Sequence, residues 1–207
     1  MKGLLKNEFF TMRRVILLYA GVLLLYYLLG VFGTQMAGVQ IFSVFFCTML
    51  VISSFSYEEK SGWSTYVNVL PVSRSQIVFC KYLFAVICMA VAAAFGLLVQ
   101  SGMNLKNGDP VFQDVWVAGA AVIVASLFLS VVLPVLFKVG AEKSRVVLVL
   151  IFLIPFAVAL VAEKAGIKIH VSAEQLLSLL PAMGFGVAAV LLLSCAVSME
   201  IYKRKEF

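Results

Sequence analysis

The stretch from Val15 to Tyr57, VILLYAGVLLLYYLLGVFGTQMAGVQIFSVFFCTMLVISSFSY, decides the fold class, because its 43 residues include no Lys, Arg, Asp or Glu. A helix crosses the hydrocarbon core of a bilayer in about 20 residues, so the stretch predicts two transmembrane helices. Gly30, Gly33 and Gly38 mark the turn between them. The stretch is continuously apolar, without the alternation of a membrane barrel strand, which favours helices.

The composition of the whole chain supports this interpretation. Of its 207 residues, 63% are hydrophobic and 13% are charged, whereas a soluble domain has about 45–50% and about 25%. This balance excludes a water-soluble globular enzyme and a disordered or collagen-like chain. It predicts an all-α polytopic integral membrane protein. The net charge of +6 lies at the ends of apolar runs, so it indicates membrane topology and no nucleic-acid partner.

Charge-free runs along the chain predict six transmembrane helices within one transmembrane domain, 1–207. They cover approximately residues 15–33, 39–57, 81–101, 115–137, 145–163 and 180–200. Both termini then lie on one side, together with 13 of the 16 Lys and Arg residues. The positive-inside rule makes that side cytoplasmic. We therefore expect a multi-pass protein of a bacterial cell membrane.

No predicted span carries a charged side chain in its middle. Lys81, Arg145 and Glu200 lie at span ends, where they can reach the interface. This pattern argues against a proton-coupled carrier, whereas sodium coupling through backbone carbonyls stays open. The chain contains no HExxH, GxSxG or GxxxxGK[ST] motif, so we expect no catalytic site, metal or cofactor in it. Energy for uphill transport must then enter from a separate subunit.

The cytoplasmic loop 58–80, EEKSGWSTYVNVLPVSRSQIVFC, separates the second and third spans. Four of its residues have the helical spacing i, i+3, i+4 and i+7: Trp63, Tyr66, Val67 and Leu70. They predict a short amphipathic helix of two to three turns, loosened at its start by Gly62 and ended by Pro71. Two interpretations stay open: an interfacial anchor at the lipid headgroups, or a helix that docks on a cytoplasmic partner.

A second helix start follows in the same loop. Ser73 and Gln76 fit the capping box S-x-x-Q. They predict that the next helix begins near Arg74, below the membrane, and continues into the third span.

The N-terminal segment 1–14 is basic and amphipathic. Leu5, Phe9 and Met12 fall on one helical face. The segment is either the ordinary basic flank of the first span or an interfacial helix near anionic lipid. In the second case, five of its residues lie at the membrane interface: Lys2, Lys6, Phe9, Arg13 and Arg14.

The run YEEKSGWSTYVNVLPVSRSQIVFCKYL, residues 57–83, resembles the loop of ABC-2 type transporter permeases, small six-helix subunits in which E…G…LPVSR…K recurs. The N-terminus MKGLLKNEFFTMRRVILLY is also similar to theirs. The resemblance implies that two permease subunits pair, as a homodimer or a heterodimer, above two ATP-binding subunits that hold ATP and Mg. It implies a coupling helix at Ser61–Leu70 and an interfacial connecting helix at 1–14. The residues expected to contact the ATP-binding subunit are Glu58, Glu59, Gly62, Trp63, Tyr66, Val67, Leu70, Pro71 and Arg74.

We therefore expect a permease subunit of an ABC exporter. The few polar residues within or near the spans either line a path or bond to helix backbones. They are Gln35, Gln40, Thr48, Ser53, Ser54, Gln100 and Ser101. The apolar spans favour an amphipathic or hydrophobic cargo, such as a peptide, a lipid or a drug. The alternatives are the six-helix substrate-capture subunit of an importer, and a non-transporting immunity or regulatory membrane protein.

The docking interpretation predicts that charge reversal at Glu58 or Glu59, or Trp63→Ala, lowers ATP-driven transport without blocking membrane insertion. Transport by reconstituted protein and the amount inserted are the two measurements. Unchanged transport in all three variants contradicts the docking role.

Overall fold

The computed structural model describes residues 2–32, 39–67, 69, 71–107, 115–141, 143–144 and 173–205. All regular elements within these ranges are α-helices. They are α1 (Lys2–Phe32), α2 (Val39–Ser61), α3 (Trp63–Tyr66), α4 (Arg74–Asn107), α5 (Val115–Val139) and α7 (Ala173–Lys203). The all-α class predicted from the sequence is therefore confirmed for these residues.

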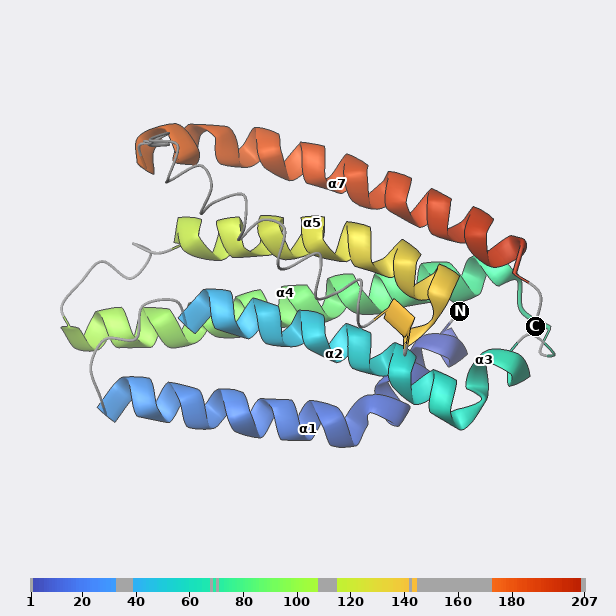
Figure 1. The fold of residues 1–207 in the computed structure, drawn as a ribbon. Helices are drawn as coiled ribbons and strands as arrows, with labels where there is room; N and C mark the ends of the chain where they lie inside the picture. Colours follow the sequence, from blue (N-terminus) through green and yellow to red (C-terminus); the bar gives the residue numbers. More distant parts are fainter. Residues whose placement is uncertain are drawn as a thin grey trace.

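The five long helices run side by side in an elongated bundle (Figure 1). Helix α5 packs against α7 and α2, while α4 packs against α2 and α7, and α1 covers α2 and α4. The start of α1 and the end of α7 lie at the same end of the bundle (Figure 1). The short helix α3 lies at this end, which we call the terminal end.

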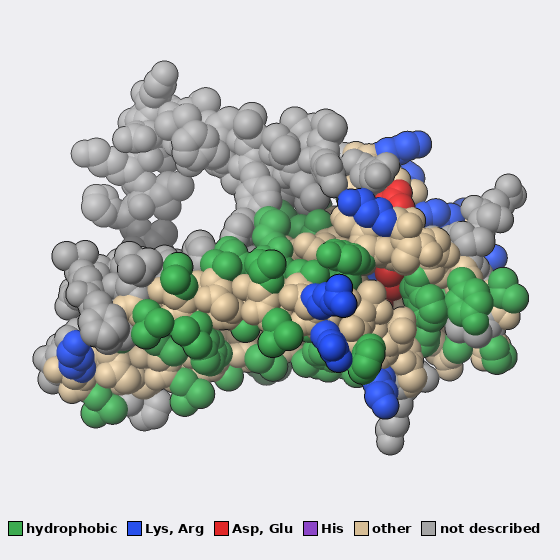
Figure 2. All heavy atoms as spheres, turned by 90° about the horizontal axis from the view of Figure 1, so that it is seen from below, with side chains coloured by type: hydrophobic (Ala, Val, Ile, Leu, Met, Phe, Trp, Pro, Cys, Tyr) green, Lys and Arg blue, Asp and Glu red, His purple; other side chains and the backbone are tan. Residues whose placement is uncertain are grey.

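The outer surface of the bundle suits lipid. Three helices within the described ranges are long and apolar enough to cross a membrane: Arg74–Lys106, Val115–Val139 and Ala182–Lys203. Large apolar side chains such as Leu17, Phe185 and Leu192 are exposed, and such a surface is unfavourable in water. Figure 2 shows apolar side chains along the length of one face, with most Lys and Arg gathered towards the terminal end. The chain is therefore a membrane protein.

The helix bounds differ from the predicted ranges at three places. The described parts of the predicted interfacial segment and of the first span, residues 2–14 and 15–32, form one continuous helix, α1. Within the predicted helix 61–70, Ser61 ends α2 and the described helical turn is α3, Trp63–Tyr66. The span 145–163 lies outside the described residues. The helix containing the span 180–200 begins earlier, at Ala173.

A polar layer joins three helices within the apolar core. Ser194 Oγ donates to the Ser130 carbonyl at 2.6 Å, so its oxygen accepts from the Tyr82 hydroxyl at 2.7 Å. Ser198 Oγ lies 2.8 Å from the same hydroxyl. Hydrogen bonds between membrane helices each contribute about 0.6–2 kcal/mol. The layer therefore fixes α4, α5 and α7 at one level beside fully buried side chains such as Leu133.

The turn after α5 requires glycine. Gly140 has a φ of 86°, where an L side chain is strained. A Cβ there would lie 2.9 Å from Glu59 Oε1. The Glu59 carboxylate also accepts a hydrogen bond from the Ala141 amide at 2.6 Å. The turn is thus shaped around a carboxylate from α2.

We predict that Gly140→Ala lowers the free energy of unfolding by about 1–3 kcal/mol, because it adds left-handed backbone strain and displaces Glu59. Gly102→Ala is the matched control, since Gly102 lies in α4 and its Cβ would meet nothing within 4 Å. There alanine is expected to be neutral or stabilising by up to about 1 kcal/mol. Unfolding titrations in detergent measure both, and equal stabilities would contradict the account of the turn.

Candidate functional site

The loop between α2 and α4 exposes one tyrosine and buries one valine. Gly62, with a φ of 68°, ends α2 and leads into α3. Beyond it, Tyr66 is 58% exposed whereas Val67 is 2% exposed. Tyr66 and Val67 therefore do not share the predicted common face, because the described helical turn α3 ends at Tyr66. Trp63 is half-buried with its ring centroid 5.4 Å from that of Tyr66, and Leu70 lies outside the described residues.

The end of the loop is a capping box, as predicted. The Ser73 amide donates to Gln76 Oε1 at 3.2 Å, and the Gln76 amide donates to Ser73 Oγ at 3.3 Å. Helix α4 begins at Arg74. Pro71 is exposed just before this box. The start of α4 is therefore determined by local sequence.

Lys81 lies at the centre of a buried group of polar side chains at the terminal end. Its side chain is 2% exposed, and its Nζ lies 2.6 Å from Glu8 Oε1 and 2.9 Å from Glu58 Oε2. Nζ also donates to Ser54 Oγ at 2.6 Å and lies 4.7 Å from the centroid of the Phe55 ring. All three ammonium protons thus have acceptors, drawn from α1 and α2. Removing one partner of such a buried pair typically costs about 3–5 kcal/mol.

The sequence did not predict that Lys81 is buried inside the protein, with its ammonium group enclosed by other helices. Helix α4 starts seven residues earlier, at Arg74, and α1 covers the lysine from the side. Glu8 was missed altogether. Its signal in the sequence is that it is the sole acidic residue of the basic segment 2–14.

Two carboxylates share the single ammonium group, so their proton affinities diverge. Burial opposes ionisation of Glu8, but the charge of Lys81 and hydrogen bonds from Lys81 and Ser54 outweigh it and lower the pKa of Glu8. Burial raises the pKa of Glu58 from 4.5 to about 7, against the attraction of Lys81 and with the added repulsion of Glu8. With both ionised, the cluster formed by Glu8, Ser54, Glu58 and Lys81 carries a net charge of −1. We call it the lysine cluster.

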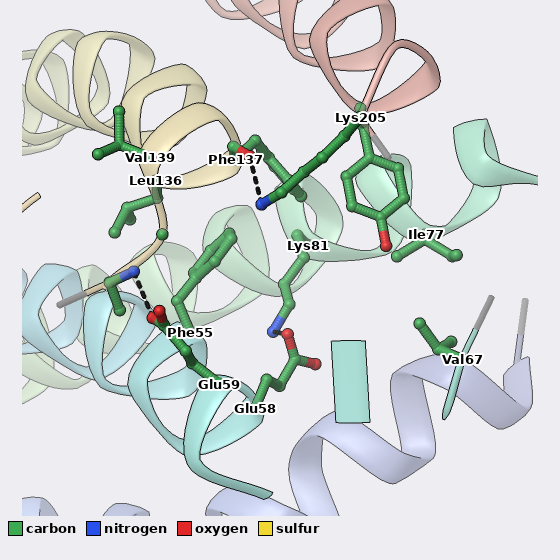
Figure 3. A pocket seen from close by; sticks show the side chains of 13 residues that line it. Phe55, Glu58, Glu59, Val67, Ile77, Lys81, Leu136, Phe137, Val139 and Lys205 are labelled. Atoms are coloured by element: carbon green, nitrogen blue, oxygen red, sulfur yellow. Dashed lines mark hydrogen bonds and ion pairs between the residues drawn. The ribbon is translucent and has the colours of Figure 1, made fainter. Parts of the chain in front are cut away.

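Glu59 points to the opposite side of α2 and binds the turn after α5. The lysine cluster and this turn border a cavity of about 150 Å³. Figure 3 shows Glu59 directed to the Ala141 amide and Glu58 beside Lys81, with Phe55 between the two pairs. Both glutamates therefore make contacts inside the subunit. Charge reversal at either one is expected to disturb the fold, which weakens these two variants as tests of docking.

The C-terminal end of α7 is held by the start of α4. Arg74 Nη1 donates to the carbonyl of Lys203 at 2.6 Å and to that of Lys205 at 3.2 Å. Lys205 Nζ donates to the Phe137 carbonyl at 3.1 Å, a bond visible in Figure 3. These donors satisfy carbonyls at helix ends that lack partners within their own helices. The start of α4 is thereby joined to the end of α7, and the residues that follow α7 are joined to the end of α5.

The N-terminal half of α1 packs on the protein through its apolar face. Met12 is 1% exposed, and Leu5 and Phe9 pack against the same core. The Phe9 ring meets the Phe84 ring edge-on at 5.1 Å between centroids. On the other side of the helix, the Arg13 guanidinium lies 5.4 Å from the Phe10 ring centroid.

Three basic residues of this segment, Lys6, Arg13 and Arg14, are exposed, and the side chain of Lys2 lies outside the described residues. Their place at the membrane interface stays a prediction, and Phe9 of the same predicted set packs on the protein core instead. Within the described ranges, no group of three His, Cys, Asp or Glu side chains is placed to hold a metal ion.

Comparison with known proteins gives one family. The model of a family described as ABC-2 family transporter protein matches residues 3–203. No curated protein and no solved structure matches the chain significantly.

The lysine cluster predicts a specific dependence of stability on pH. The folded protein holds the Glu58 proton more tightly than the unfolded chain does, because its pKa is raised to about 7. The resulting contribution to stability is complete below about pH 4.5 and is lost as the pH rises through about 7. Glu8 acts in the opposite sense, because its lowered pKa stabilises the fold above about pH 4.5 and this contribution is lost in more acidic solution.

We therefore expect the free energy of unfolding to rise as the pH is lowered from about 7.5 to about 5. In Glu58→Gln this rise should disappear, since glutamine does not titrate. Glu200→Gln is the control, because Glu200 is exposed and pairs with Arg204, one turn further along the same end of the chain. Detergent unfolding across this pH range measures all three, and a persistent rise in Glu58→Gln would contradict the assignment.

Proposed function

The chain belongs to the ABC-2 family of transporter proteins, and on this premise we propose that it is the membrane-spanning permease subunit of an ABC exporter. A separate ATP-binding subunit supplies the energy and holds ATP and Mg. The permease pairs with a second permease subunit, identical or related. The cargo is amphipathic or hydrophobic, and it moves outwards across the cell membrane.

One observation carries this proposal: the loop between α2 and α4 has an exposed tip on a fixed base. Tyr66 is 58% exposed at the tip. At the base, Glu58 binds Lys81 and Glu59 binds Ala141, while Arg74 binds the end of α7. Exposed Tyr and Trp side chains are frequent anchors of protein interfaces. This arrangement suits a coupling element that receives force from a partner and passes it to several helices.

The mechanism follows from how the base is joined. Closure of two ATP-binding subunits would displace α3, and the fixed base would carry the displacement into α4. The lysine cluster would carry it further into α1, and Arg74 would carry it into α7. Packed helices respond to such a displacement as rigid bodies. The spans of the paired permeases would then open alternately to the two sides of the membrane.

The polar residues of the spans support an apolar cargo. Thr48 Oγ1 donates to the Val44 carbonyl at 3.0 Å, and Ser53 Oγ donates to the Met49 carbonyl at 2.9 Å. Ser101 Oγ donates in the same way to the carbonyl of Leu97 at 2.7 Å. These hydroxyl protons are therefore used within their own helices. Such spans offer a polar solute few donors.

Reconstitution tests the proposal as a whole. Affinity purification from the native membrane should capture an ATP-binding subunit together with the full chain. Proteoliposomes holding both should accumulate a labelled hydrophobic peptide at the expense of ATP, and a small polar solute should not accumulate. Uphill transport by the chain alone, or selective movement of the polar solute, would overturn the proposal.

Tyr66→Ala tests the exposed tip without touching the base. We predict that this variant lowers ATP-driven transport and retention of the ATP-binding subunit by about tenfold or more, as expected for an aromatic anchor that contributes about 2 kcal/mol. Trp116→Ala is the control, because Trp116 lies at the start of α5, far from the terminal end. Membrane insertion should be normal in both. Full activity of Tyr66→Ala would contradict a docking role for the tip.

A further inference from the structure

A second cavity lies on the other side of the lysine cluster, between α1, α2 and α3. Its volume is about 210 Å³. Helix α1 contributes Asn7 and Thr11, which are four residues apart and share a helical face. Helix α2 contributes Glu58 and Ser61, and Trp63 lies at the edge. The cavity is therefore walled by a carboxylate, an amide, hydroxyl groups and an indole ring.

Among the described residues that line this cavity, the charged ones are Glu8 and Glu58, and both are acidic. Lys81 lies behind them and neutralises one of the two charges. Glu59 and Lys205 are directed into the other cavity, towards the Ala141 amide and the Phe137 carbonyl. When Glu58 is ionised, one negative charge therefore remains without a cation at the edge of the 210 Å³ cavity.

The wall fits an organic ammonium group better than a metal ion. A hard cation requires about six oxygen ligands, whereas both oxygens of Glu8 already accept hydrogen bonds, from Lys81 and Ser54. A primary ammonium needs only three acceptors. Glu58, Asn7 and the hydroxyls of Thr11 and Ser61 line the cavity as acceptors, and an indole face attracts cations.

The depth of the cavity indicates the source of the ammonium. Thr11 and Glu58 lie just beyond the cytoplasmic ends of the predicted spans 15–33 and 39–57, at the level of the lipid headgroups. Arg14 is exposed and follows Thr11 by three residues in α1. It therefore lies about one turn closer to the bilayer than Thr11 does. In phosphatidylethanolamine the phosphate lies closer to the hydrocarbon than the ammonium does. Along α1, Arg14 therefore lies at the level of the phosphate, and the cavity lies at the level of the ammonium.

We propose that the 210 Å³ cavity binds the primary ammonium of an aminophospholipid headgroup, with Glu58, Asn7 and Thr11 as acceptors and Arg14 beside the phosphate. The site joins α1 to the foot of α3, so an occupied cavity holds these elements together. This proposal does not depend on the transport function, because the ligand is a lipid of the surrounding membrane.

The two tryptophans of the chain make a direct test available. In Trp116→Phe, Trp63 is the sole tryptophan, and it lines the cavity. The full-length variant is placed in nanodiscs of phosphatidylcholine with increasing fractions of phosphatidylethanolamine, and the emission of Trp63 is recorded. Phosphatidylcholine is the matched lipid, since its ammonium has no N–H donors. A further arm adds free ethanolamine to nanodiscs of phosphatidylcholine alone.

We expect a saturable change in Trp63 emission with phosphatidylethanolamine and no change with free ethanolamine. Glu58→Gln should raise the half-saturating lipid fraction about tenfold or more, as expected for the loss of an acceptor to a charged donor. Thr11→Val should also weaken lipid binding, and it leaves the contacts of Lys81 intact. This variant therefore tests the site if Glu58→Gln fails to fold. Glu200→Gln should bind as the parent does.

Three results would overturn the proposal. The first is an equal response to both lipids, which shows no recognition of the ammonium protons. The second is unchanged binding in folded Glu58→Gln and Thr11→Val. The third is a response to free ethanolamine that equals the response to the lipid, which would assign the cavity to a soluble amine.

Discussion

A lysine removed from water must be neutralised by groups brought to it, and this constraint organises the terminal end of the protein. Lys81 is 2% exposed and uses its three donors on Glu8, Glu58 and Ser54. These acceptors come from two other helices, so the cluster fixes the rotation and height of α1 and α2 against α4. The net gain in stability from such buried pairs is small, because desolvation offsets attraction. The consequence of the cluster is a specific arrangement of helices.

The same constraint divides the loop between α2 and α4 into a fixed base and an exposed tip. Glu58 is committed to the lysine cluster and Glu59 to the turn at Gly140, on opposite sides of α2. The four-residue helix α3 is too short to be stable by its own hydrogen bonds. Its position depends on the αL turn at Gly62 and on the burial of Val67. A partner that contacts Tyr66 would therefore act on a small element held by rigid neighbours.

The sequence predicted the features that depend on local chemistry. The class of the protein follows from apolar runs, and the start of α4 follows from a capping box whose two residues are three positions apart. The apolar face of Leu5, Phe9 and Met12 was also evident, and it packs on the core. The sequence did not predict what this face covers. Glu8 and Lys81 lie far apart in the sequence, and the residue pattern around each of them gives no indication that they pair.

The burial of Lys81 has a physical cause that was already present in the predicted helix bounds. A lysine at the end of a helix extends its chain towards water, and Lys81 stands at the end of the apolar run. The end of an apolar run and the end of a helix are separate places here, because α4 begins at Arg74, about two turns earlier. The cation that does lie at the helix end is Arg74, and it binds the carbonyls that end α7. The capping box places Lys81 two turns inside α4, and a charge that another helix covers there needs a partner inside the protein. Glu8, the one acid of the basic segment 2–14, is that partner on α1.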